Sequence, residues 1–200
     1  MMAALSASCP TALKEWAGVI DAMGRGQQLV LIRKGGLVDA ARGFEIRSTE
    51  FVFYPTFEHQ TINYLRPQYR RYLEEALAAR PPEGQVRVEL AGKVVWSRQS
   101  RDPSLLERLE PFHIYNGQFL AQRLKWQPDQ PLVVAVVRCW RLAAAQQLPV
   151  AAHYAGCKSW VELDAPVSLR AASPVLENRV FEERLAQITG VLDRAQSTVG

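Results

Sequence analysis

Two polar segments near the N-terminus each follow a short apolar run, and they hold residue types that could bind or transform an anion. Arg33, Lys34, Gly35 and Gly36 follow the apolar run 29–32. Two cations beside glycines, whose amides can approach an anion without a Cβ in the way, predict a phosphate site. The spacing of a P-loop is absent. A charged strand end followed by a glycine turn is the alternative interpretation.

The second polar segment follows the apolar run 51–54 and supplies Thr56, Glu58, His59 and Gln60. A carboxylate next to an imidazole suits proton transfer, which makes His59 a candidate general acid or base and Glu58 the residue that orients it. Thr56 and Gln60 are candidate hydrogen-bonding groups for a ligand. The alternative is that these side chains cap a helix or fix a loop.

A third polar segment, residues 154–162, contributes Lys158 and Ser159 as candidate ligand-binding residues. Lys158 beside Cys157 could generate a reactive thiolate, whereas a small buried thiol is the simpler interpretation. A nucleophile there would need a base, and the sequence leaves open whether His59 or His153 lies near enough to serve as one.

We expect no metal site and no cofactor. A mixed zinc site could in principle be formed by His153, Cys157, His59 and Glu58. Their positions in the sequence do not show the paired spacing that is usual for zinc ligands. A further segment, residues 64–72, alternates tyrosines with arginines. That mixture can stack bases and neutralise phosphates, but at helical spacing it also fits tyrosines facing a core and solvated arginines.

Composition limits the class of protein. The 200 residues, 48% apolar and 22% charged, fit one globular domain over residues 11–198 after a flexible N-terminus at 1–10. No apolar run approaches the length of a membrane span, so we expect no membrane association. The N-terminus lacks a basic signal region and the three cysteines form no CxxC pair, which predicts a cytoplasmic protein. A charge of +4 permits phosphate-bearing partners but does not demand them.

The elements that must position these residues follow from apolar periodicity and turn signals. We expect helices and strands in clusters rather than in strict alternation, which favours an α+β domain with a mixed or mostly antiparallel sheet, partial barrel closure being an alternative. The predicted helices are 11–24, 67–79, 103–109 and 176–195, with 112–124 undecided. The predicted strands are 28–33, 44–54, 86–90 with 94–96 as a hairpin about Gly92, 132–137, and 150–154 with 158–163.

The change of apolar parity between Ile46 and Phe51 has two explanations. Either a bulge lies near Ser48, or the strand is buried on both faces toward its end.

Four ordered blocks, residues 12–16, 33–36, 53–60 and 154–163, resemble an uncharacterised prokaryotic family, domain of unknown function 1802. The resemblance spans most of the chain from about Thr11 to the final helix. It implies a single soluble domain and assigns no catalytic residue, substrate or cofactor.

Three hypotheses about function remain. The first is a binding module for a phosphate-bearing ligand, a nucleic acid or nucleotide, held by the residues named above. The second is an enzyme acting on a phosphoester or related bond with His59 as acid or base. The third is a structural or protein-interaction domain. A protein partner is not identifiable. If the polar segments converge on one cleft, the first two hypotheses gain support.

Overall fold

A computed structural model describes residues 5–34, 44–156 and 158–194. The loop predicted for 35–43, with Gly35 and Gly36, and Cys157 lie outside the described residues.

The described chain is one α+β domain built on a mixed sheet in the order β2-β5-β4-β3-β1-β6, with β7 paired to β5. The strands are β1 (Ser8–Trp16), β2 (Val30–Arg33), β3 (Glu50–Thr56), β4 (Gln85–Ser100), β5 (Leu132–Pro149), β6 (Trp160–Ser168) and β7 (Ser173–Pro174). The helices are α1 (Ala17–Gly24), α2 (Arg70–Ala78), α3 (Pro103–Arg108), α4 (Gly117–Lys125) and α5 (Asn178–Arg194), with 3-10 turns η1 (Ile62–Tyr64), η2 (Pro67–Tyr69), η3 (Glu110–Phe112) and η4 (Ala152–Tyr154).

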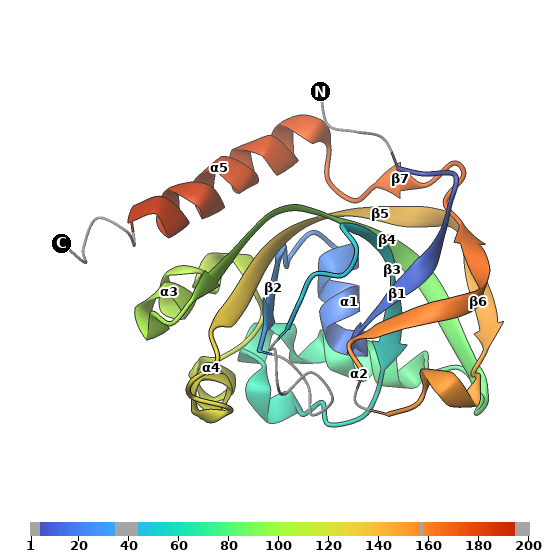
Figure 1. Cartoon of the computed structure of the whole chain (residues 1–200), viewed down its shortest axis with the longest axis horizontal. Helices are drawn as coiled ribbons and strands as arrows, with labels where there is room; N and C mark the ends of the chain where they lie inside the picture. Colours follow the sequence, from blue (N-terminus) through green and yellow to red (C-terminus); the bar gives the residue numbers. More distant parts are fainter. Residues whose placement is uncertain (1–4, 35–43, 157, 195–200) are drawn as a thin grey trace.

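The sheet is mixed, as predicted, because β1 and β3 run parallel while the other pairs are antiparallel. It is strongly curved but not closed. The side chain of Gln146 in β5 exchanges hydrogen bonds with the backbone of Ser168 in β6, although no strand ladder joins β5 to β6 in the described residues. Figure 1 shows β4 and β5 arching over α1, with α5 on the outer side of the arch.

Strand β3 and the first half of β5 are buried on both faces, which explains their unbroken apolar sequences, whereas the second half of β5 and much of β6 are exposed. In β3, Phe51 and Phe53 pack into one apolar cluster with β2, β5, α4 and α5, whereas Val52 and Tyr54 pack into a second cluster with β6 and η4. Residues 51–54 are thus buried on both faces of the sheet, but Ile46 lies before the strand, so the change of parity between Ile46 and Phe51 does not occur within β3 and requires no bulge. The strand predicted for 44–54 begins only at Glu50.

The helix predicted for 11–24 is wrong in its first half. Residues 8–16 form β1 and only Ala17–Gly24 are helical, so residues 8–10, which we assigned to the N-terminal tail, lie in a strand. In β1 the neighbouring residues Ala12 and Leu13, on opposite faces of the strand, are both buried. A strand buried on both faces shows no clean two-residue alternation of apolar and polar residues. Its apolar positions can then imitate a helical stripe.

The hairpin predicted about Gly92 is also wrong, because Gly92 lies inside β4, a single strand of 16 residues. A Cβ on Gly92 would come within 2.9 Å of Phe51, Phe53 and Val137. The glycine is therefore needed for close packing rather than for a turn.

The two arms predicted for 150–154 and 158–163 do not pair. The first is the turn η4, and β6 begins at Trp160. The helices predicted for 67–79, 103–109 and 176–195 are present with shifted ends, and the undecided segment contains α4. None of the described helices has the length and apolarity to cross a bilayer.

Candidate functional site

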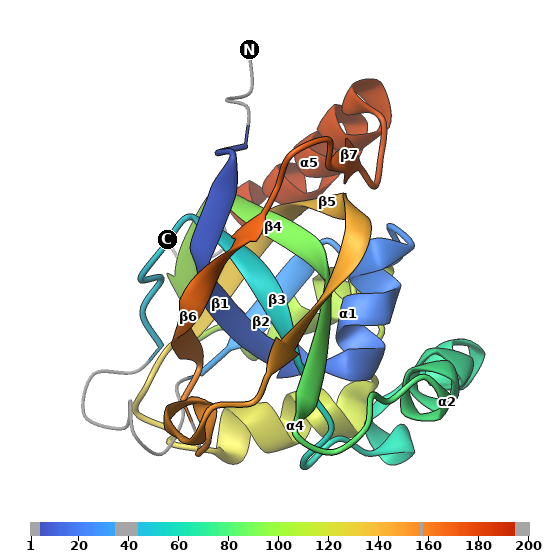
Figure 2. The same ribbon diagram turned by 90° about the vertical axis from the view of Figure 1, so that its right-hand side faces the viewer.

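One cavity of about 690 Å³ lies where the C-terminal ends of β1, β2 and β3 meet α4 and the segment before β6. We call it the site cavity. Figures 1 and 2 show α4 at this end of the sheet. Its lining includes the predicted residues Arg33, Lys34, Thr56, Glu58, His59, Lys158 and Ser159. Three segments distant in the sequence thus contribute to one concave surface of the size that holds a small ligand.

Arg33 lines the site cavity, and an ion pair with Glu15 orients its side chain. The guanidinium Nη1 donates to Glu15 Oε2 at 3.0 Å, and the two side chains are 16% and 6% exposed. Glu15 Oε1 also accepts from the backbone N–H of Trp16 at 2.8 Å. Both carboxylate oxygens are therefore engaged, and one edge of the Arg33 guanidinium is held in a fixed orientation.

Arg123 lies near Arg33 but, unlike Arg33, has no carboxylate bound to its guanidinium among the described residues. Its guanidinium stands 5.0 Å from the centroid of the Phe119 ring, and it makes no hydrogen bond or ion pair with other described residues. Burial, followed by the positive charge of Arg33, lowers the pKa of Arg123. A half-buried cation facing a second cation attracts an anion.

The ammonium of Lys34 is positioned by the end of α4. It donates to the backbone carbonyl of Leu124 at 2.9 Å, and the residue is only 3% exposed. Burial lowers the pKa of Lys34. The side chain of Asn116 caps α4 by accepting from the N–H groups of Gln118 and Phe119, so a local cap fixes the helix that supports Lys34.

The opposite wall carries two more lysines. Lys14 Nζ donates to the carbonyl oxygens of Tyr154 and Gly156, and Lys158 Nζ donates to that of His153 at 3.0 Å. Ser159 is buried, and its carbonyl accepts from the Lys14 N–H at 2.8 Å. Lys14 and Lys158 therefore brace the turn η4 and also line the site cavity.

Glu58 and His59 line the same cavity but do not form the expected pair. Both side chains are exposed, and no hydrogen bond or ion pair joins them in the described residues. The backbone of His59 has φ +59°, a left-handed conformation that is uncommon for non-glycine residues and concentrates at functional sites. The geometry gives His59 a place in the cavity without an orienting carboxylate.

Gln60 is the one predicted, described site residue that does not line the site cavity. Its amide donates to the Thr56 carbonyl at 3.2 Å and accepts from the Gly18 N–H at 3.5 Å. This matches the loop-fixing alternative for that residue. Thr56 itself donates to the Glu15 carbonyl at 3.2 Å while lining the cavity.

Eight lining residues were not singled out from the sequence as functional: Lys14, Glu15, Trp16, Thr61, Phe119, Gln122, Arg123 and Trp126. Phe119 and Arg123 lie in the segment 112–124, for which the sequence does not decide a structure, and Trp16 lies in the predicted helix 11–24. Of the aromatic and arginine-rich stretch 64–72, only Tyr64 reaches the cavity. Arg66 instead pairs with Glu110 at 3.0 Å.

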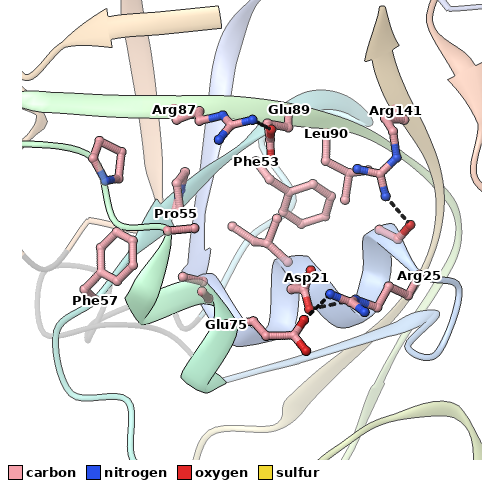
Figure 3. A pocket seen from close by; sticks show the side chains of 16 residues that line it. Asp21, Arg25, Phe53, Pro55, Phe57, Glu75, Arg87, Glu89, Leu90 and Arg141 are labelled. Atoms are coloured by element: carbon pink, nitrogen blue, oxygen red, sulfur yellow. Dashed lines mark hydrogen bonds and ion pairs between the residues drawn. The ribbon is translucent and has the colours of Figure 1, made fainter. Parts of the chain in front are cut away.

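A second cavity, of about 240 Å³, lies between α1, α2 and strands β3 to β5 (Figure 3). Its floor includes Phe53 and Leu90. The charged groups at its mouth are satisfied by the protein itself, since Arg25 contacts both Asp21 and Glu75 and Arg87 contacts Glu89. Such a rim offers less to an anion than the site cavity does.

No group of three or more histidine, cysteine or acidic residues is arranged to hold a metal in residues 5–34, 44–156 and 158–194. In particular, His153 contacts Asp164 at 3.2 Å on the exposed surface. The mixed zinc set considered from the sequence includes Cys157, which lies outside the described residues.

Comparisons with known proteins give a family and one distant structure. The family profile described as Domain of unknown function (DUF1802) matches residues 12–187. No match was found among the curated proteins. The crystal structure of a serine-to-alanine mutant of ZmASCH from Zymomonas mobilis is similar with a TM-score of 0.42 and 12% identity, covering 89% of this chain and 94% of that chain.

Proposed function

This chain belongs to the family described as Domain of unknown function (DUF1802), and because that description assigns no activity, we propose from the site cavity alone that the protein binds a phosphate-bearing ligand, a nucleotide or nucleic acid. The observation that carries the proposal is the charge of the cavity. Five cationic side chains, Lys14, Arg33, Lys34, Arg123 and Lys158, line it against two carboxylates, Glu15 and Glu58.

The distribution of these charges supports an anionic ligand. Glu15 forms its ion pair with Arg33, and Glu58 is exposed. Neither carboxylate forms an ion pair with Arg123 among the described residues, and the negative charge of Glu15 offsets only part of the effect of burial on the Arg123 pKa. A phosphate could accept hydrogen bonds from the Arg123 guanidinium, and the nearby positive charge of Arg33 adds to the attraction. Because Glu58 does not contact His59, binding has more geometric support than proton transfer.

Binding to a fluorescein-labelled single-stranded decamer tests the proposal by fluorescence anisotropy at several salt concentrations. The double variant Arg123→Gln with Lys158→Gln removes two cationic contacts from the cavity while keeping polar side chains. We expect affinity at low salt to fall at least about tenfold and the salt slope to fall by about 1.4, since each lost contact with a single strand contributes about 0.7.

A control variant matched in net charge is Arg87→Gln with Arg179→Gln, because both arginines are exposed and outside the site cavity. Its affinity and salt slope should stay close to those of the unchanged protein. Absence of binding at low salt, or equal weakening by the two double variants, contradicts the proposal. In the second case the attraction would come from net charge alone.

A further inference from the structure

Trp126 is an exposed aromatic residue on the wall of the site cavity. It follows α4 directly, and its backbone N–H donates to the Gln122 carbonyl at 3.0 Å. The residue remains 41% exposed. In the part of the chain that the structure describes, its ring contacts no other aromatic ring and no cation. Leaving an indole in water gives up apolar burial that the fold could otherwise use.

The other aromatic residues of the cavity are occupied by one another. Trp16 lies against Tyr64 and, edge-on, against Phe119, with centroid separations of 6.2 and 5.5 Å. Phe119 in turn stacks on Tyr115 at 3.8 Å. These rings form one packed cluster in the wall of the cavity. Among the described Trp, Tyr and Phe residues that line the cavity, Trp126 is the one whose ring has no aromatic partner.

The surroundings of Trp126 combine a ring with charge and hydrogen-bonding groups. Arg123 lies three residues earlier on α4, which places the two on the same side of the helix end. Lys34 is bonded to the carbonyl of Leu124 between them. Gln122 also lines the cavity and offers an amide that can both donate and accept.

A nucleotide in a single strand matches this combination. Its base has a flat apolar face that stacks on indole, its edges carry donors and acceptors, and its phosphate carries the charge that Arg123 attracts. In a duplex both faces of each base are covered by neighbouring bases. Only an unpaired base can place its face against a ring on a cavity wall.

We propose that the site cavity takes an unpaired nucleotide of a single-stranded nucleic acid, with the base stacked on Trp126 and the phosphate bound by Arg123. This inference rests on the proposed phosphate-binding function and adds the class of ligand. The stacked base selects single strands over duplexes, and the phosphate contact supplies the salt-dependent part of the affinity.

The test compares Trp126→Ala and Trp126→Phe with the unchanged protein on four probes: a single-stranded decamer, the same decamer in a duplex, an abasic decamer with the same number of phosphates, and inorganic tripolyphosphate. We expect Trp126→Ala to weaken single-strand binding by about 5- to 150-fold, the range that stacking of one base supplies. Trp126→Phe should recover part of that loss. Binding of tripolyphosphate and of the abasic decamer should not change with either substitution.

Leu77→Ala is the matched control, because Leu77 is also an exposed apolar residue, 47% exposed, but lies on α2 outside the site cavity. It should leave single-strand affinity unchanged. If the abasic decamer or the duplex binds the unchanged protein as tightly as the single strand, the stacking inference fails while phosphate binding stands. The same holds if Trp126→Ala binds normally. If no probe binds at low salt, the proposed function fails as well.

Running the comparison with RNA and DNA decamers of equal sequence shows which of the two the cavity accepts. Comparable affinity for both supports recognition through base and phosphate alone. A strong preference for RNA would require a contact to the 2′-hydroxyl that the stacking inference does not contain, and would overturn it as the sole basis of recognition.

Discussion

Single residues differ sharply in how far the protein satisfies their charge. Arg33 is held by the Glu15 carboxylate at 3.0 Å, whereas the guanidinium of Arg123 lies over the Phe119 ring and forms no ion pair with the described residues. Lys34 donates to a backbone carbonyl, which leaves its positive charge without a counter-ion at that contact. The sequence singles out Arg33 and Lys34 because they follow an apolar run. It gives no such signal for Arg123, which comes near Arg33 only through the fold.

The buried imidazole of His113 supplies a pH-dependent prediction. His113 is fully buried, its Nε2 lies 3.2 Å from the Leu106 carbonyl, and burial lowers its pKa to about 4. Between pH 6.5 and 4 the unfolded chain takes up a proton that the folded chain does not. Stability should therefore fall with falling pH, by about 3 kcal/mol over this range from this residue.

Urea unfolding of the unchanged protein and of His113→Gln at pH 4, 5, 6 and 7 measures this contribution. The curve of stability against pH should be flatter for the variant, because the titrating imidazole is gone while the carboxylates remain. Parallel curves would mean that the imidazole does not titrate differently in the two states.

At the scale of elements, helix caps and apolar periodicity predict structure reliably where an element is buried on one face only. The helix α3 begins at Pro103 as predicted, because Asp102 caps it through the N–H of Ser104. Signals become ambiguous where a strand is buried on both faces, as in β1. They also mislead at Gly92, where a turn residue serves the packing of a long strand.

Gly92→Ala tests that role of glycine in β4. The added methyl would come within 2.9 Å of Phe51, Phe53 and Val137, so we expect a loss of about 1–3 kcal/mol in the free energy of unfolding. If Gly92 were a turn residue in a tolerant loop, alanine would be accepted with a smaller effect.

Gly190→Ala in α5 is the matched control, because a Cβ there meets nothing within 4 Å. Alanine in a helix interior should stabilise the protein by about 0.5–1 kcal/mol. Denaturant unfolding of the two variants should thus give shifts of opposite sign.

At the scale of the whole molecule, the curvature of the sheet creates the site cavity. Three strands separate β2 from β1 in the sheet order, yet Arg33 at the end of β2 contacts Glu15 in β1. A flat sheet would hold these residues more than a dozen ångström apart, since neighbouring strands are about 4.8 Å apart. The curve also brings α4 against the same strand ends.

Glu15→Gln measures how strongly this pair holds the curved sheet together. The amide can still accept from the Trp16 N–H, so the change removes mainly the charge that faces Arg33. We expect a loss of about 2 kcal/mol in unfolding free energy, the size of a charged hydrogen bond in a largely buried setting.

Glu183→Gln is the control for that substitution, because its pair with Arg179 is exposed on α5. Exposed pairs contribute little, so its stability should stay close to that of the unchanged protein. A Glu15→Gln variant as stable as this control would show that the pair does not support the curved sheet.

The sequence by itself determined the α+β class, the strand that contains Val30–Arg33, the start of β5 and the positions of α2, α3 and α5, because each depends on short-range propensity, caps and apolar period. Only the tertiary structure decided that Thr11–Trp16 extends as a strand, that Gly92 lies within one, and that Arg33, His59, Arg123 and Lys158 line a single cavity. The reason is physical. These features depend on which surfaces meet across the curved sheet, and contacts between residues dozens of positions apart leave no periodic trace in the chain.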